Sequence, residues 1–365
     1  MLAAGWVAFA FAGYPLALWL LARVSPRPIR RGAQAPPISV IIAVHDGARE
    51  LAEKLRATCA LSYPGEREIL VASDASTDGS DAIAASFAAD GVRLVRREPR
   101  GGKEAAQAAA IGTARGEILV FTDVGAEVEK DALVALVAPF ADPSVGCVSS
   151  EDLVSRDEGE GAYAAYEMAI RRLESRAGSL VGCSGSLFAA RRTLCTPWPA
   201  ELASDFRIAL EAASRGLRAV SEPGARARIA PLHDPRREWS RKVRTVRRGL
   251  AVLAAYRALL APRAGRVAFA LWGHKVARFT APFALAVLLA VSAIAAPHAG
   301  WAQGLLLAQL LFYALGAASL ASARVRHATL PRLAGFFLLV NASILSAWIH
   351  HLAGHRAVTW KPTPR

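Results

Sequence analysis

Four long apolar runs constrain most strongly what this chain of 365 residues can fold into. The first, at residues 5–22, holds no charged residue, and three more follow at residues 279–296, 302–321 and 333–349. An α-helix needs about 20 apolar residues to cross the hydrocarbon core of a bilayer. The runs therefore predict one N-terminal and three C-terminal membrane helices, with a more polar region between them.

Basic residues beside these runs predict how the chain is oriented. Several arginines follow the first run, and Lys275 and Arg278 precede the second. Because positively charged loops stay in the cytoplasm, we expect residues 23–278 and the loop at 323–332 on the cytoplasmic face of the plasma (inner) membrane. Both chain ends then lie outside. The tail at 353–365 is nevertheless basic, so the last run could also be re-entrant or interfacial.

The charge of the chain has two possible explanations. There are 44 Lys and Arg residues against 30 Asp and Glu residues, which gives a net charge of +14. Nucleic-acid binding would account for this charge, but not for a composition that is 53% hydrophobic. We therefore expect anionic membrane lipids, and not nucleic acid, to meet the basic residues, which gather at 236–248. Residues 266–279 mix apolar and basic residues at helical spacing and predict a helix in the membrane interface.

The region between the apolar runs alternates predicted strands with predicted helices. Continuous apolar stretches at 38–44, 68–74 and 117–123 are typical of strands buried on both faces. Such alternation forms right-handed βαβ units and predicts an α/β domain with a mostly parallel sheet. The predicted division of the chain is a membrane helix (1–24), a basic linker (25–36), this domain (37–250), interfacial helices (251–278), about three membrane helices (279–352) and a basic tail (353–365).

Two of the predicted strands, EILVASD and EILVFTD, echo each other and end in Asp74 and Asp123. Ligands of an open parallel sheet bind beyond the carboxyl ends of its strands. We therefore expect both carboxylates at one crevice that binds a nucleotide-type ligand, although both could also be ordinary strand-end residues. Neither GxGxxG nor GxxxxGK[ST] follows a strand, which argues against a dinucleotide enzyme and a P-loop ATPase.

Several stretches together resemble one known family. ISVIIAVHDGARE, SYPGEREILVASDASTDGS, RGGKEAAQAAAIGTARGEILVFTDVGA, EKDAL, GCSGSLFAARR, ASDFRIALEAASRGLRAV, EWSRKVR and TWKPTPR are similar, in order and spacing, to the inverting GT-A glycosyltransferases of family 2. The best match is the membrane-embedded branch, with polysaccharide synthases and lipid glycosyltransferases. The resemblance implies a Rossmann-like GT-A domain that moves a sugar from a cytoplasmic nucleotide sugar to a lipid or glycan acceptor, in polysaccharide or glycolipid biosynthesis.

The resemblance also implies a donor site. Asp74 falls where the family binds the base and ribose of a nucleotide-diphosphate sugar, which we expect to be a UDP-sugar. Lys103 falls on a donor-side lysine, and Asp123 on the first residue of the metal-binding DxD motif. Glu238 and Arg241 fall on the first and fourth positions of the family's QxxRW motif, near the diphosphate and the acceptor.

Asp205 falls on the catalytic base of the family, although it could also cap the helix that follows it. Inverting transfer needs one base, which takes a proton from the acceptor hydroxyl as that oxygen attacks the anomeric carbon. The leaving nucleoside diphosphate gains negative charge, which a metal ion or a basic side chain must stabilise.

The sequence departs from the family at Gly125, Gly47, Ala108 and Lys242. Gly125 replaces the second DxD ligand, so an Mg²⁺ or Mn²⁺ ion at Asp123 would need donor phosphates and water to complete its coordination. Arg241, Lys242 or Lys103 could neutralise the diphosphate without a metal instead. These departures also leave open a second function class, a catalytically impaired scaffold that binds a nucleotide sugar within a polysaccharide assembly.

Overall fold

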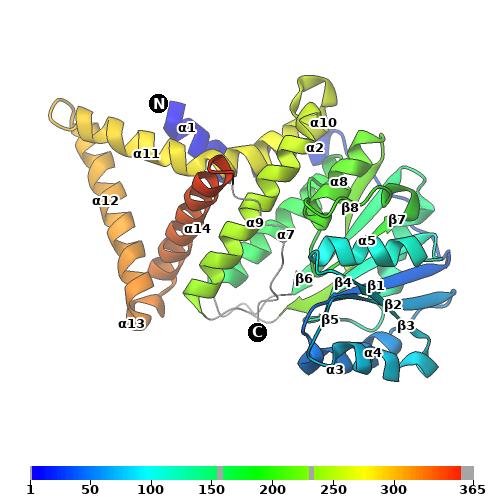
Figure 1. Cartoon of the computed structure of the whole chain (residues 1–365). Coiled ribbons are helices and arrows are strands. Elements are labelled where there is room, and N and C mark those ends of the chain that lie inside the picture. Colours follow the sequence, from blue (N-terminus) through cyan, green and yellow to red (C-terminus); the bar gives the residue numbers. More distant parts are fainter. Residues whose placement is uncertain (1, 154–158, 230–233, 355–365) are drawn as a thin grey trace.

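The computed structural model describes residues 2–153, 159–229 and 234–354 of the chain (Figure 1). An α/β domain occupies one side of the molecule, and long apolar helices extend from it on the other side. The predicted fold class, an α/β domain with membrane-type helices, is therefore confirmed.

Eight described strands form one sheet in the order β3-β2-β1-β4-β7-β6-β8-β5. Strand β1 pairs in parallel with β2 and β4, and β2 pairs in parallel with β3, as predicted. The other half is mixed, because β7 runs antiparallel to β4 and β6, and β5 runs antiparallel to β8. The strands are β1 (Ile38–Val44), β2 (Arg67–Asp74), β3 (Val92–Arg97), β4 (Ile118–Asp123), β5 (Ala126–Val128), β6 (Val145–Leu153), β7 (Leu187–Arg191) and β8 (Arg218–Ile229).

Helices cover both faces of this sheet. Because side chains alternate along a strand, Val120 packs with Leu55 of α3 on one face, and Phe121 packs with Ala106 of α5 on the other. The first face carries α3 (Ala48–Cys59), α4 (Ser80–Ser86) and α6 (Ala132–Val137), and the second carries α5 (Lys103–Thr113) and α8 (Ser204–Ser214). Both faces are buried, as the continuous apolar strands predict.

Among the described residues, four helices are long and apolar enough to cross a membrane: Leu2–Val24, Arg266–Ala295, Gly300–Ala321 and Thr329–Leu352. They confirm the four predicted apolar helices. Residues 266–278 continue without a break into the second of these helices, and a π-helical stretch, η7, marks the join. The segments are α1 (Leu2–Ala8), η1 (Phe9–Gly13), α2 (Tyr14–Val24), α10 (Arg266–Ala270), η7 (Leu271–Val276), α11 (Ala277–Ala295), α12 (Gly300–Ala321), α13 (Ala323–Arg326) and α14 (Thr329–Leu352).

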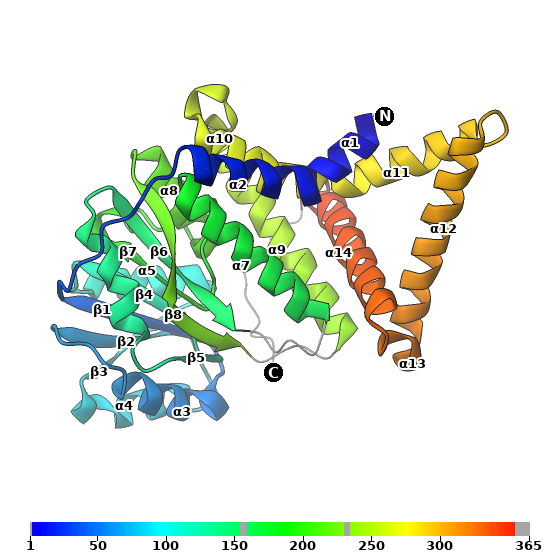
Figure 2. The ribbon, with the colours of Figure 1, turned by 180° about the vertical axis from the view of Figure 1, so that it is seen from behind.

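Two further helices, α7 (Gly159–Ala177) and α9 (Pro235–Ala255), connect the domain to the apolar helices. Figure 2 shows α2 running alongside α7, and Tyr14 and Leu18 of α2 pack on Ile170 of α7. Val246 of α9 packs on Ile344 of α14. The remaining short helices are η2 (Ala88–Asp90), η3 (Ala138–Ala141), η4 (Arg192–Leu194), η5 (Arg257–Leu260) and η6 (Pro262–Ala264).

Candidate active site

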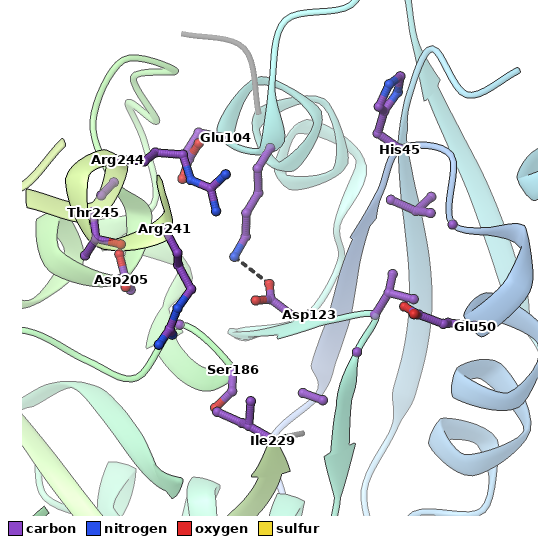
Figure 3. Close-up of a pocket in the computed structure, with 18 of the residues that line it drawn as sticks. His45, Glu50, Glu104, Asp123, Ser186, Asp205, Ile229, Arg241, Arg244 and Thr245 are labelled. Carbon is purple, nitrogen blue, oxygen red and sulfur yellow. Dashed lines mark hydrogen bonds and ion pairs between the residues drawn. The ribbon is translucent and has the colours of Figure 1, made fainter. Parts of the chain in front are cut away.

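A cavity of about 750 Å³ lies beyond the carboxyl ends of β1 and β4, between the sheet and α9 (Figure 3). This is the place at which an open parallel sheet binds its ligands. Carboxylates and cations both line the cavity. The acidic lining residues are Asp46, Glu50, Glu104, Asp123, Asp152 and Asp205, and the basic ones are Arg49, Arg100, Lys103, Arg241, Arg244 and Arg248.

The alternation of side chains along β4 gives each of its last two residues a different lysine. Thr122 faces α3, where its hydroxyl accepts a hydrogen bond from Lys54 Nζ at 2.9 Å. Asp123 faces α5, where its Oδ1 forms an ion pair with Lys103 Nζ at 2.5 Å, the contact drawn as a dashed line in Figure 3. The strand end therefore holds one carboxylate that is already neutralised by a cation.

Lys103 stays charged at this position. Burial lowers the pKa of its ammonium group, but the carboxylates of Asp123, Glu104 and Asp205 outweigh that effect, so its pKa lies above the ordinary value for lysine. Lys103 is the first residue of α5, after the Gly101-Gly102 turn. A fixed positive charge thus faces the cavity beside Asp123.

Lys54 supports the turn between β4 and β5 from the other face of the sheet. It is buried, and its ammonium group donates to the Ala126 carbonyl at 2.6 Å as well as to Thr122. These two contacts lie on either side of the Asp123 to Gly125 segment. Burial lowers the pKa of Lys54 to about 8, although Asp123 and Glu127 oppose the shift.

This pKa predicts how pH affects stability. Below pH 8 Lys54 is protonated in both states, whereas between pH 8 and 10.5 only the unfolded state holds the proton, so folding becomes more favourable as pH rises. The gain reaches about 3 kcal/mol over that window. Between pH 7.5 and 9.5, the melting temperature of wild type should therefore rise relative to Lys54→Met. The exposed Lys130→Met variant is the control, and parallel curves for wild type and Lys54→Met would contradict the assignment.

Asp205 lies across the cavity from the sheet, on α8. The helix begins at Ser204 with Ala203 as N-cap, so Asp205 stands inside the first turn and the helix-cap interpretation is wrong. Its Oδ1 accepts a hydrogen bond from its neighbour's amide, Phe206 N–H, at 2.9 Å. A Cβ atom at Gly185 would lie 3.2 Å from Asp205 Oδ2, so a larger residue there would crowd the carboxylate.

Three arginines of α9 approach the cavity from one helix face. Arg241, Arg244 and Arg248 follow i, i+3 and i+7 spacing, which places them on the same side of a helix. Figure 3 shows Arg241 and Arg244 on the opposite side of the cavity from Asp123. Burial lowers the pKa of Arg244, Arg248 and Arg241 lower it further, and Asp123 opposes them. The cationic face is thus crowded with like charge.

Two buried glutamates fix this cationic face. Glu238 forms a two-pronged contact with Arg241, with Nε and Nη2 3.0 and 2.9 Å from its oxygens. Glu104 pairs with Arg248 at 2.5 Å and lies 3.4 Å from the Ser204 amide, next to Asp205. Glu238 does not line the cavity and acts on it through Arg241. The pair Glu104 and Arg248 therefore links α5 to α9, and the contact of Glu104 with Ser204 links α5 to α8.

Asp74 has a different environment from the one expected. It ends β2 at the same sheet edge as Asp123, but β1 lies between the two strands. Its fully buried carboxylate accepts hydrogen bonds from the amides of Gly101 at 2.8 Å and Gly102 at 2.7 Å, and it does not line the described cavity. The structure therefore brings Lys103, Asp123, Asp205 and Arg241 together around the cavity. Asp74 and Glu238 do not line it and instead contact residues that support the lining.

The site also contains residues that the sequence reading missed. Arg244 and Arg248 could have been found from their spacing to Arg241, once that segment was assigned to a helix. Asp152 gave no such signal, because it is the penultimate residue of β6, which lies in the mixed half of the sheet. Its Oδ1 accepts from Ser184 Oγ at 2.6 Å and also from Ser186 Oγ, and both Asp152 and Ser186 line the cavity.

The side chains present do not fit a divalent cation held by the protein. Asp123 offers one carboxylate, which Lys103 already occupies, and Gly125 offers none. Over the described ranges, no three His, Cys, Asp or Glu residues are grouped as a metal site would require. Hard divalent cations take several oxygen ligands, so any such ion here would depend mainly on ligands from outside the chain.

Comparison with known proteins matches part of this chain to a family. Residues 39–195 match the family described as glycosyl transferase family 2. An N-acetylglucosaminyltransferase of Azorhizobium caulinodans is 26% identical over 235 residues, which are 56% of this chain and 59% of that protein. A beta-monoglucosyldiacylglycerol synthase of Synechocystis sp. is 26% identical over 171 residues, 44% of this chain and 36% of that protein. The matched part of the chain thus spans 59% of the length of the first relative and 36% of the length of the second.

A solved structure extends the likeness to the apolar helices. A mannosyltransferase from Pyrobaculum calidifontis, in complex with GDP-Man and Mn²⁺, is 25% identical. The match covers 98% of this chain and 100% of that chain, with a TM-score of 0.74. The predicted GT-A fold and the predicted resemblance are confirmed by these matches.

Proposed function

We propose that this chain, whose residues 39–195 form a glycosyltransferase family 2 domain with the GT-A fold, is an inverting hexosyltransferase bound to the plasma (inner) membrane. Its donor is a nucleotide-diphosphate sugar, with a UDP-sugar as our first choice. Its acceptor is a hydroxyl group of a lipid or glycan at the membrane. The observation that carries the proposal is one cavity that joins Asp205 to the Lys103–Asp123 pair and the α9 arginines.

The reaction requires one proton transfer and one displacement. Asp205 accepts the proton of the acceptor hydroxyl while that oxygen forms a bond to the anomeric carbon from the face opposite the leaving group. The bond from that carbon to the diphosphate breaks, and the electron pair leaves with the nucleoside diphosphate. Attack from the opposite face inverts the configuration at the anomeric carbon.

The charge of the leaving diphosphate is met by fixed cations. We assign this role to Lys103 from α5 and to Arg241 and Arg244 from α9, which line the same cavity from different elements. Guanidinium groups match phosphate oxygens in a two-pronged geometry. Glu238 and Glu104 hold the α9 cations in place, so little reorganisation is needed during the reaction. Asp74 supports the donor side through the Gly101-Gly102 turn that precedes Lys103.

The relatives support the classes of donor and acceptor. One similar protein is named for N-acetylglucosamine transfer and another for glycolipid synthesis, and the similar solved structure contains a nucleotide-diphosphate sugar. Four apolar helices beside the domain support an acceptor at the membrane. The basic flanks support a cytoplasmic catalytic domain, because positive loops stay on that side.

Sugar transfer by the purified full chain tests the proposal. We would supply radiolabelled UDP-sugars and GDP-sugars with a membrane lipid extract as acceptor, and follow label in the organic phase and in polymer. The configuration of the new bond, read by NMR, must be opposite to that of the donor. Donor binding without transfer to any acceptor would favour a catalytically impaired scaffold, and the absence of donor binding would remove both functions.

A further inference from the structure

A second charged cluster lies outside the cavity, where α7 meets η7 and α11. His274 of η7 stands between two glutamates of α7, with Nδ1 2.7 Å from Glu174 Oε1 and Nε2 3.0 Å from Glu167 Oε2. Arg278 of α11 forms an ion pair with Glu167, and Tyr14 of α2 donates to Glu174 at 2.5 Å. The cluster therefore joins α2, α7, η7 and α11 at the border between the α/β domain and the apolar helices.

The cluster contains guanidinium nitrogens that nothing in the described chain satisfies. Arg171 lies between Glu167 and Glu174 on the same face of α7, and its Nε and Nη1 are buried without hydrogen-bond partners. Arg278 is only 6% exposed, and its Nε and Nη2 are likewise buried without hydrogen-bond partners. Buried donors of this kind are normally satisfied, and a cluster of them indicates an absent acceptor.

The net positive charge of the cluster indicates that the missing partner is an anion. Arg171, Lys275 and Arg278 are cations, against the two carboxylates of Glu167 and Glu174, even if His274 is counted as neutral. Burial raises the pKa of Glu167, but Arg278 and His274 outweigh it and hold that pKa well below its usual range. Glu167 is thus engaged through both of its oxygens, whereas Glu174 uses Oε1 for His274 and Tyr14 and keeps Oε2 buried without a hydrogen-bond partner. An additional anion would balance the excess positive charge.

The cluster is open beside the candidate active site. Lys275 is partly exposed, and no described residue forms a hydrogen bond or ion pair with its ammonium group. That group lies 5.1 Å from the centre of the Phe206 ring, and Phe206 follows Asp205 in α8. A Cβ atom at Gly182 would lie 3.5 Å from Lys275 Nζ, so the ammonium also approaches the loop that leads to Gly185.

The other side of the cluster belongs to the membrane helices. Lys275 and Arg278 stand within Arg266–Ala295, one of the four helices able to cross a bilayer. The π-helical stretch η7 carries His274 and Lys275, and such interruptions are frequent at functional sites. An anion that reaches these residues therefore comes from the membrane surface, where basic pockets between helices bind lipid headgroups.

We propose that Arg171, Lys275 and Arg278 bind the phosphate group of a membrane lipid and hold it beside the active site. The inference rests on the proposed function, because it makes this lipid the acceptor. We assign the phosphate as an anchor and not as the attacking group, since Lys275 lies against the Phe206 ring and does not line the cavity that contains Asp205. The hydroxyl that reacts belongs to the part of the headgroup that extends past Phe206, as in a lipid that carries a sugar on its phosphate.

Lipid binding to the full chain in detergent, followed by native mass spectrometry, tests this site. The probes are an isoprenoid-alcohol monophosphate, the same alcohol without phosphate, and inorganic phosphate. We expect the lipid monophosphate to bind and the alcohol not to bind. Arg171→Gln should weaken the lipid monophosphate about 10- to 100-fold, as expected for a lost charge-assisted contact, and Arg171→Lys should recover part of the loss.

Arg172 provides a matched control one residue away. Its side chain pairs with Glu151 on another face of α7, so Arg172→Gln should bind the lipid monophosphate like wild type. UDP affinity should not change in either variant, which separates this site from the donor cavity and from the proposed function. Equal lipid affinity in wild type and Arg171→Gln would overturn the proposal. Inorganic phosphate that binds as tightly as the lipid monophosphate would overturn the lipid assignment.

Discussion

Replacing Asp205 by Asn is expected to lower the transfer rate about 100- to 10,000-fold, because Asn cannot accept the proton of the acceptor hydroxyl. The amide keeps the shape of the side chain and can still accept a hydrogen bond from the Phe206 amide. Donor affinity should therefore stay close to that of wild type. Single-turnover transfer gives the rate, and calorimetric titration with the nucleoside diphosphate gives the affinity.

Glu211→Gln is the control for this experiment. Glu211 lies on the same helix as Asp205, but it pairs with Arg215 and Tyr256 and does not line the cavity. Its variant should transfer sugar at the wild-type rate. A wild-type rate in Asp205→Asn would remove the base assignment, whereas a loss of donor binding in that variant would instead place Asp205 on the donor.

The parts of the fold that depend on local pattern could be predicted from the sequence. The buried strands, the four apolar helices and the parallel order around β1 all follow from apolar runs and their spacing. The mixed half of the sheet could not be predicted in this way, because the pairing of β7 with β4 joins segments far apart in the chain. Asp152 and Ser186 come from that half, so their place in the cavity was not foreseeable.

In the candidate site, too, the sequence predicts which residues take part, but not the contacts that they make. Asp123 and Lys103 were found through motifs, but their ion pair depends on which face of β4 the Asp123 side chain takes. Asp74 was expected at the ligand because its strand echoes that of Asp123. Pattern alone does not reveal that the Gly101 and Gly102 amides already occupy its two oxygens. Whether Asp74 reaches the donor stays a prediction.

The burial of Lys54 could not be predicted from the sequence either. A lysine within an amphipathic helix is normally read as a solvated residue, and nothing in its sequence context indicates otherwise. The structure buries it because the β4 to β5 turn supplies the Ala126 carbonyl and the Thr122 hydroxyl as partners. Those partners are far from Lys54 in sequence, so only the folded chain reveals that this lysine supports the Asp123 segment.

Replacing Lys103 by Met is expected to lower transfer about 100- to 1,000-fold, the usual effect of removing one charged group that stabilises a leaving oxyanion. Lys103 stands where it can neutralise both Asp123 and a bound diphosphate. The same interpretation makes the wild-type chain tolerant of chelation, because its own cations take the place of a metal. Donor affinity, measured by calorimetry with EDTA or with Mn²⁺, should therefore be nearly the same.

Adding Gly125→Asp to the Lys103→Met variant is expected to make donor binding depend on a metal ion. Gly125 is not among the glycines with positive φ, so an aspartate is compatible with the backbone there. In the double variant with Lys103→Met, Asp123 is released from its ion pair and gains a second carboxylate two residues away. Donor affinity and bound Mn²⁺, followed by electron paramagnetic resonance, should then rise together. If wild type already loses its donor on chelation, the metal supplies the charge, and Lys103 serves only to orient Asp123.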